Sequence, residues 1–275
     1  MKLLFVHERF GAFGGAEVNM ALTASAFKQR GHTVALLHGP PTGKGETNWR
    51  EIFSERREID GNAGAESVRM ALKQFSPDAI YLHKLADLGA IEALVESQYP
   101  LARMVHDHDL YCMRSYKYHP LSRKICLRPA SLACILPCGA VLARNRESGL
   151  PFKWVSYSAK KKEIALNRRI QQMVVATGYM REELLRNGFS GGQIEIHAPV
   201  PRFEDAVQPA TFGERNLILF AGQIIRGKGV DVLLEALAKV QVPFECVIFG
   251  DGGHRVFCED LSRRLGLEAR VKFRG

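Results

Sequence analysis

The strongest constraint on the fold is a regular alternation of short apolar segments with longer amphipathic ones. The apolar segments are rich in Val, Ile, Leu and Ala, as buried strands are. Strands are predicted at Lys2–His7, Thr33–His38, Ala79–Leu82, Ala102–His106, Gln172–Ala176, Asn216–Ala221, Glu245–Phe249 and Arg270–Phe273. Helices are predicted at Ala16–Arg30, Glu66–Phe75, Leu88–Glu96, Tyr179–Asn187, Val230–Val240 and His254–Leu265. This order predicts an α/β fold of parallel sheets covered by helices on both faces.

Length and composition then suggest two domains. A chain of 275 residues is too long for one ordinary core. The segment Pro199–Glu214 has three prolines and no helix or strand period, so it reads as a linker. We therefore expect domains at 1–200 and 215–275, joined by a linker at 201–214. The second domain is shorter than the roughly 100 residues of a complete doubly wound domain, so we expect it to stop half built at Gly275.

The charge balance narrows the class of ligand only slightly. The chain carries a formal charge of +9, which fits an anionic ligand, an anionic lipid surface or nucleic acid, but also simple solubility. No motif favours nucleic acid. No apolar run approaches the roughly 20 residues that span a bilayer, and the N-terminal run is too brief for a signal peptide. We expect a cytoplasmic protein whose cysteines are reduced or metal-bound.

Two glycine-rich loops follow predicted strands. In the first, Gly14 and Gly15 precede Glu17 at the start of a helix. In the second, Gly222 is followed by Arg226 and Lys228 before the next helix. Glycines let the backbone approach a ligand closely, and the free amides of a helix start attract phosphate. Both loops therefore predict anion binding; the alternatives are a tight turn and a solvated basic loop.

A third glycine-rich segment, Gly39–Thr47, resembles a phosphate loop only superficially. Three residues, not four, separate Gly39 from Gly43, and Gly45 instead of Ser or Thr follows Lys44. We expect a flexible basic loop with no helix opening there, and no nucleoside triphosphatase activity.

Histidine and aspartate gather at the end of one predicted strand. His106, Asp107, His108 and Asp109 follow it directly, and ligands of open α/β sheets collect at the carboxyl ends of strands. These side chains could orient a hydroxyl group or share a proton. The alternative is a capping Asp beside a partly buried His.

Four cysteines follow this motif within a short stretch. Cys112, Cys126, Cys134 and Cys138 have the spacing C-x13-C-x7-C-x3-C. Four thiolates can complete a tetrahedral zinc site, although tightly paired C-x2-C spacings are missing. A structural metal, free thiols and disulfides all remain open.

The ordered series of motifs resembles the GT-B glycosyltransferases of family 4. It comprises Gly14-Gly15-Ala-Glu17, the Arg-Gly-His-Thr-Val that ends the first helix, Val-His106-Asp107, Ala176-Thr-Gly178-Tyr, Ile-His-Ala-Pro-Val, Gly222 with Lys228-Gly229, and Gly250-Asp-Gly. The match covers nearly the whole chain. Each piece alone is weak, but the order is specific.

The resemblance implies two Rossmann-like domains, the first binding the acceptor and the second a sugar nucleotide. It implies sugar transfer with retention of configuration and without a bound metal, as in polysaccharide biosynthesis. The family's first glycine-rich loop lies near donor phosphates and acceptor, which implies donor contacts for Gly14 and Gly15 and an acceptor side at Glu17 and Asp107. His106 would lie beside the reacting sugar as the catalytic residue.

In the second domain, the resemblance implies that Gly222, Arg226 and Lys228 hold the diphosphate. The chain departs from the family at Gln223, where Arg is usual, and the family's acidic E-x7-E segment would lie beyond Gly275. The alternatives to an active transferase are a catalytically dead module that binds glycan or glycolipid, and a metal-binding regulator built on the cysteines.

A basic stretch near the middle of the chain raises the possibility of peripheral association with an anionic membrane at its inner face. The stretch consists of Lys153, Trp154, Lys160, Lys161, Lys162, Arg168 and Arg169. The alternative for these residues is a solvated helix face.

Overall fold

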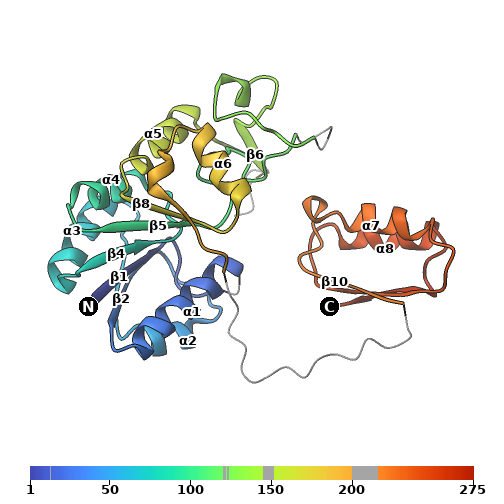
Figure 1. Cartoon of the computed structure of the whole chain (residues 1–275), viewed down its shortest axis with the longest axis horizontal. Coiled ribbons are helices and arrows are strands. Elements are labelled where there is room, and N and C mark those ends of the chain that lie inside the picture. The colour runs from blue at the N-terminus through green and yellow to red at the C-terminus, as the bar shows by residue number, and fades with distance from the viewer. Residues whose placement is uncertain (13, 120–121, 123, 145–151, 200–215) are drawn as a thin grey trace. The chain divides into compact units, whose positions relative to one another are not determined.

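The computed structural model describes residues 1–12, 14–119, 122, 124–144, 152–199 and 216–275. It divides into two compact units, Met1–Arg202 and Phe203–Gly275. Each unit has hydrophobic core clusters of its own (Figure 1). The linker predicted at 201–214 lies outside the described residues.

The first unit contains a seven-stranded parallel sheet with the strand order β3-β2-β1-β4-β5-β8-β9. Its strands are β1 (Lys2–His7), β2 (Thr33–His38), β3 (Glu55–Glu58), β4 (Ala79–Leu82), β5 (Leu101–Val105), β8 (Gln172–Val175) and β9 (Ile194–Ile196). The predicted α/β fold is confirmed. The two edge strands, β3 and β9, were missed because β3 is polar throughout and β9 has only three residues.

Helices cover both faces of this sheet because its central strands are apolar on both sides. Along β1, Leu4 and Val6 belong to one core cluster and Phe5 to the other, as strand alternation requires. Helices α1 (Gly15–Gln29) and α2 (Glu46–Ile52) contribute to the Phe5 cluster. The opposite cluster receives residues of α3 (Gly64–Phe75), α4 (Leu88–Glu96), α5 (Tyr157–Asn167) and α6 (Gly178–Arg186).

Helix α2 corrects one expectation from the sequence. The segment Gly39–Thr47 was predicted to lead into no helix, yet α2 begins at Glu46. Gly45 stands directly before it with a positive φ of 64°, a conformation that suits glycine. Trp49 in α2 is only 2% exposed, so packing of one large side chain stabilises a helix too short for periodicity to reveal.

A long connection links β5 to α5 and contains all four clustered cysteines. We call its residues 110–144 the β5–α5 insert. It includes a 3-10 turn, η1 (Leu132–Cys134), and ends at β6 (Leu142–Arg144), which pairs antiparallel with β7 (Phe152–Trp154). In Figure 1 the insert, drawn in green, projects beyond the sheet of the first unit.

The insert is attached to α6 by buried polar contacts. Lys117 Nζ lies 2.7 Å from Glu183 Oε2, and the two side chains are 3% and 0% exposed. The backbone N–H of Ala130 donates to Asn187 Oδ1 at 2.9 Å. A buried ion pair of this kind holds the insert in one place because separating it would leave an uncompensated buried charge.

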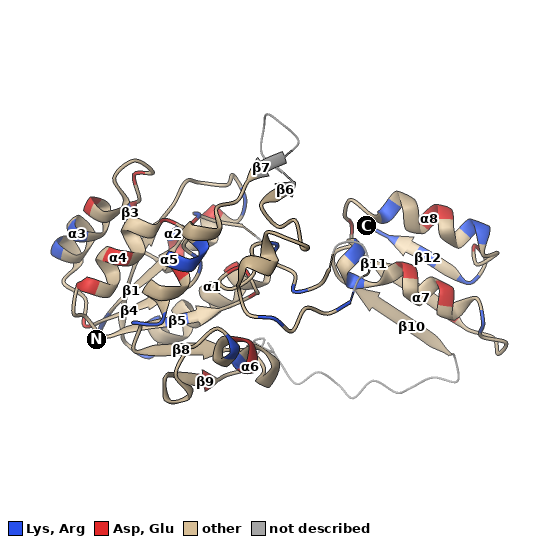
Figure 2. Cartoon of the chain, turned by 90° about the horizontal axis from the view of Figure 1, so that it is seen from above, with Lys and Arg blue, Asp and Glu red and all other residues tan. Residues whose placement is uncertain are grey.

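The second unit is smaller and consists of a parallel sheet with helices packed against it. Its sheet has the order β10 (Leu217–Ala221), β11 (Glu245–Phe249) and β12 (Val271–Arg274). Helices α7 (Val230–Leu237) and α8 (Arg255–Arg264) pack against it and lie on one face of the sheet in Figure 1. Figure 2 shows basic and acidic residues together along α3 and α8, as on ordinary solvated helix faces. Within the described residues, no helix has the length and apolar character needed to cross a membrane.

Candidate functional site at the ends of the parallel strands

The strand order reverses direction between β1 and β4. From β1 the chain builds outward through β2 and β3, and from β4 it builds the other way. In open α/β sheets, ligands bind outside the carboxyl ends of the strands at this reversal point. A histidine stands at or just beyond the end of each nearby strand: His7 on β1, His83 after β4 and His106 after β5.

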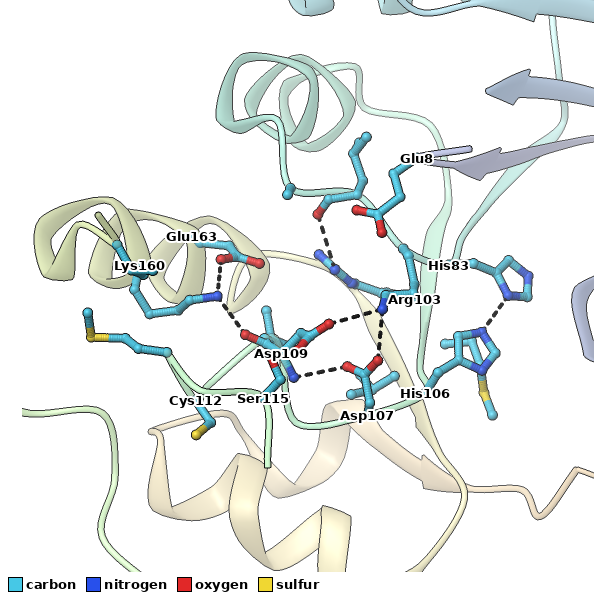
Figure 3. A pocket seen from close by; sticks show the side chains of 18 residues that line it. Glu8, His83, Arg103, His106, Asp107, Asp109, Cys112, Ser115, Lys160 and Glu163 are labelled. Carbon is cyan, nitrogen blue, oxygen red and sulfur yellow. Dashed lines mark hydrogen bonds and ion pairs between the residues drawn. The ribbon is translucent and has the colours of Figure 1, made fainter. Parts of the chain in front are cut away.

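A pocket of about 310 Å³ opens at this edge (Figure 3). Eighteen side chains line it, and they come from the ends of β1, β4 and β5, from α5 and the residues just before it, and from the insert. Its charged or titratable members are Glu8, His83, Lys84, Arg103, His106, Asp107, Asp109, Cys112, Lys160 and Glu163. The pocket is therefore lined by acidic, basic and neutral polar side chains, which together suit a ligand rich in hydroxyl groups.

Lys84 joins the two aspartates of the His106–Asp109 motif. Its Nζ lies 2.9 Å from Asp107 Oδ2 and 3.0 Å from Asp109 Oδ2. Burial opposes its charge, but Asp107 and then Asp109 outweigh burial and raise the pKa of Lys84 above its ordinary value. The ammonium group thus stays charged and holds both carboxylates beside the pocket.

The motif also forms the expected cap. Asp107 Oδ1 accepts a hydrogen bond from the backbone N–H of Asp109 at 2.9 Å. A second carboxylate oxygen of the same residue binds Lys84. Asp107 therefore closes the turn after β5, as the capping alternative expected, and keeps a charged contact with Lys84 in the pocket. Its role toward a ligand stays a prediction.

The rear wall combines a buried arginine with two residues of α5. The Arg103 guanidinium donates to the side chain of Asn167 and to the carbonyl of Leu85. Lys160 Nζ lies 2.6 Å from Glu163 Oε2 and also donates to the backbone carbonyl of Asp109. The alternative of a solvated helix face is wrong for Lys160, because its side chain is only 14% exposed.

The three histidines are held close together and uncharged. His83 Nδ1 and His106 Nε2 lie 2.8 Å apart, and the ring planes are nearly parallel, at 19°, with centroids 5.1 Å apart. Burial, and next the nearby His7, lower the pKa of His106 to about 4. Burial likewise lowers the pKa of His7 to about 4 and that of His83 well below its usual value. At neutral pH each ring is a hydrogen-bonding group rather than a cation.

The first glycine-rich loop lies beside His7. Glu17 Oε1 lies 3.8 Å from His7 Nε2. A Cβ on Gly14 would meet Glu17 Oε2 at 2.2 Å, whereas a Cβ on Gly15 would meet nothing within 4 Å. Glycine at position 14 therefore leaves room for the Glu17 carboxylate at the start of α1.

The predicted site residues fall in two groups. His106 and Asp107 line the pocket, and the charge of Glu17 acts on His106. Gly222, Arg226 and Lys228 belong to the second unit, where both basic side chains are exposed in the short turn η3 (Arg226–Lys228) that precedes α7. Gly222 has a φ of 154°, and Gly250 lies against its carbonyl.

Sequence reasoning missed Lys84, Arg103 and Glu163. Lys84 carried a signal, since it follows the end of a predicted strand. Arg103 and Glu163 carried none, because their burial depends on packing between β5 and α5.

The four clustered cysteines are all unpaired. Burial raises the pKa of the Cys134 thiol, and the neighbouring thiols of Cys138, Cys112 and Cys126 act in the same direction. No three His, Cys, Asp or Glu side chains in the described ranges are arranged to hold a metal ion. The structure thus gives no support to the predicted zinc site, and zinc binding stays a prediction.

The sheet order, and a pocket at the strand ends, define a Rossmann-like α/β protein with a second Rossmann-like unit. Three solved structures share this architecture. The lipopolysaccharide outer core galactosyltransferase WaaB in its apo form aligns with a TM-score of 0.66 and 15% identity, over 100% of this chain and 68% of that one. Anabaena HepE in complex with UDP aligns with a TM-score of 0.65 and 17% identity, over 99% of this chain and 68% of that one. A complex of S. aureus TarM with fondaparinux, alpha-GlcNAc-glycerol and UDP aligns with a TM-score of 0.64 and 9% identity, over 100% of this chain and 77% of that one.

These likenesses confirm the GT-B fold, and family models settle the family. The model described as Glycosyltransferase Family 4 matches residues 13–198. The model described as Glycosyl transferases group 1 matches residues 201–275. The chain therefore belongs to glycosyltransferase family 4, as the motif series predicted. A search of curated proteins found no match.

Proposed function

We propose that the chain transfers a sugar from a nucleotide-sugar donor to a glycan or lipid-linked acceptor, with retention of anomeric configuration. The observation that carries this proposal is the pocket at the ends of β4 and β5, where neutral His106 stands beside a network of polar groups. Hydroxyl groups of a sugar are recognised by such a mixture of donors and acceptors. The complex of Anabaena HepE with UDP-glucose makes UDP-glucose the first donor to test.

His106 acts in this proposal by orientation. A histidine whose pKa is about 4 is too weak a base to take a proton efficiently near neutral pH. It can still hold a hydroxyl group of the reacting sugar or acceptor in line. Glu17 and Asp107 would bind the acceptor from the same side.

The donor diphosphate would bind the glycine-rich loops. Gly14 is the N-cap of α1 and Gly15 its first residue, and Gly222 precedes the exposed Arg226 and Lys228. Backbone amides at helix starts and basic side chains favour phosphate. Lys228 would stabilise the charge that builds on the departing nucleoside diphosphate.

The direct test measures acceptor-dependent release of nucleoside diphosphate from a panel of UDP-, GDP- and ADP-sugars. We expect release with one donor class, a product whose anomeric configuration by NMR matches that of the donor, and a loss of roughly a hundredfold in His106→Ala, because the reacting hydroxyl group is no longer held in line. If glycan binds while no donor is bound or consumed, the chain is a glycan-binding module instead. An inverted product would rule out retention.

The proposal includes no metal for the transfer step. EDTA should leave the rate unchanged, and a rate that falls with EDTA and recovers with added metal would contradict this. Zinc on the four cysteines would be structural, and metal analysis of protein purified without chelator decides whether it is present.

We also propose that the insert carries the protein to an anionic membrane at its cytoplasmic face. Exposed apolar side chains concentrate in the insert and in the strand β7 paired with its end: Ile125 is 68%, Leu136 79% and, in β7, Trp154 74% exposed. Lys124 and Arg128 are exposed beside them, and the sequence has no Asp or Glu from Leu110 to Arg146. Apolar side chains flanked by basic ones suit an anionic lipid surface. The free thiols of the insert fit a reducing compartment.

Cosedimentation with vesicles tests this membrane contact. Binding should require phosphatidylglycerol, weaken with salt, and fall in Leu136→Ser. The matched control is Val256→Ser, at a position in the second unit that is 72% exposed. Equal binding by both variants, or binding to neutral vesicles alone, would contradict the proposal.

A further inference from the structure

His83 lies directly behind His106 and is almost completely enclosed. It is 1% exposed and stacks on Phe5, with ring centroids 5.9 Å apart. The Tyr81 ring meets it edge-on at 4.5 Å. Figure 3 shows its hydrogen bond to His106 at the edge of the pocket. Apolar packing therefore fixes the His83 ring in one orientation.

The hydrogen bond between the two rings has two possible directions. A neutral imidazole carries one N–H donor and one acceptor nitrogen. If His83 donates from Nδ1, then His106 Nε2 accepts and the proton of His106 is on Nδ1. If His83 accepts instead, then its own proton is on Nε2. The environment of His83 Nε2 therefore decides the tautomer of His106.

His83 Nε2 is buried and has no hydrogen-bond partner. In the second arrangement it would be an orphaned N–H donor, whereas in the first it is an unfilled acceptor. Orphaned buried N–H groups are rarer in proteins than under-satisfied acceptors. The first arrangement is thus favoured. Burial, which lowers the pKa of His83, also keeps the ring from becoming a double donor.

We propose that His83 is a positioning residue that holds His106 in its Nδ1–H tautomer, so that His106 presents a hydrogen-bond donor to an oxygen atom of the ligand. His106 Nε2 is occupied by His83. His106 Nδ1 has no hydrogen-bond partner among the described residues, so it is available to a ligand. The tautomer follows from the structure alone; the identity of the ligand as a sugar rests on the proposed function.

The tautomer can be measured without any turnover. Two-bond ¹H–¹⁵N correlation spectra of the full chain with labelled histidine distinguish a protonated Nδ1 from a protonated Nε2, and His106→Asn assigns the signal. We expect His106 to carry its proton on Nδ1. In His83→Phe, which keeps a ring and removes the donor, we expect a mixture of tautomers. His83→Gln retains an N–H donor and should restore the Nδ1–H form.

The matched control is His38→Phe. His38 is also buried, at 8% exposure, but its Nδ1 lies 2.8 Å from the carbonyl oxygen of Gly39. It should leave the His106 signal unchanged. If His83→Phe does not fold, His83→Leu removes the same donor, and the wild-type spectrum still tests the tautomer.

Kinetics separates positioning from a merely structural role. We expect His83→Phe to lower kcat about tenfold, the effect of one hydrogen bond of about 1.4 kcal/mol, with the donor KM little changed. His83→Gln should recover most of the rate. A wild-type His106 protonated on Nε2, or an Nδ1–H signal that persists in folded His83→Phe, would overturn the inference. If wild-type protein transfers no sugar while the spectra are as expected, the proposed function fails and the tautomer stands.

Discussion

At the scale of single residues, the site shows how burial changes what a histidine can do. His7 and His106 both have pKa values of about 4, chiefly because burial disfavours their charged forms. Lys84 has the opposite shift, since two carboxylates outweigh the effect of burial. The pocket therefore keeps fixed charges on Lys84 and its partners, and neutral hydrogen-bonding rings beside them.

The lowered histidine pKa values predict loss of stability in mild acid. In the unfolded chain these rings have an ordinary pKa near 6.5 and bind a proton below that pH. In the folded state they stay neutral until about pH 4. Stability should then fall with pH through this window, by about 1.4 kcal/mol per pH unit for each such ring. Urea unfolding at several pH values should show a slope smaller by about that amount in His106→Gln. A slope equal to that of the exposed control His197→Gln would contradict this.

A pair of adjacent glycines gives a second prediction at this scale. In Gly14→Ala the new Cβ must displace the Glu17 carboxylate, which lies 2.2 Å from its position. Because that group ends a flexible side chain, we expect a stability loss below about 1 kcal/mol but a clear loss of sugar transfer. Gly15→Ala, which meets nothing within 4 Å, should retain activity. Equal activities of the two folded variants would show that the position of Glu17 is unimportant.

At the scale of elements, the strands and helices that could be predicted from the sequence are those whose burial produces a regular pattern of apolar residues. Buried strands such as Thr33–His38 match the structure, because apolar runs are the signal of strands covered on both faces. The strand β3, with the sequence ERRE, has no such signal and forms because β2 offers it a free edge. The histidine motif after β5 could be found in the sequence because it directly follows a strand that its apolar residues predict. Arg103 was hidden because its neighbours come from distant elements.

The attachment of the insert to α6 gives a prediction about this element. Lys117→Met leaves Glu183 buried, with Arg186 as its remaining ion-pair partner among the described residues. Removing one member of a buried pair costs about 3 kcal/mol or more. We expect a loss of that order in urea unfolding and faster proteolysis within the insert. Arg69→Met breaks the exposed pair with Glu66 and should cost less than about 1 kcal/mol. Similar losses in the two variants would show that the buried contact does not anchor the insert.

At the scale of the whole molecule, the predicted site residues belong to two separate units. Every residue that lines the pocket belongs to Met1–Arg202, whereas Arg226 and Lys228 belong to Phe203–Gly275. Each unit also has its own hydrophobic core. The domain boundaries expected from the prolines at Pro199–Glu214 remain a proposal, and dissection of the chain tests them.

We expect a fragment of residues 1–202 to fold on its own. Its seven-stranded sheet is buried on both faces by helices from the same unit, so its core needs nothing from the second unit. Its urea unfolding should be cooperative. The substitution His106→Gln should reduce the slope of its unfolding free energy against pH by the same amount as in the full chain. The companion fragment of residues 203–275 has a much smaller core, so it should be less stable. If residues 1–202 unfold without cooperativity, the first unit depends on the second and the division is wrong. If they fold but His106→Gln no longer changes the slope, the second unit contributes to the burial of His106.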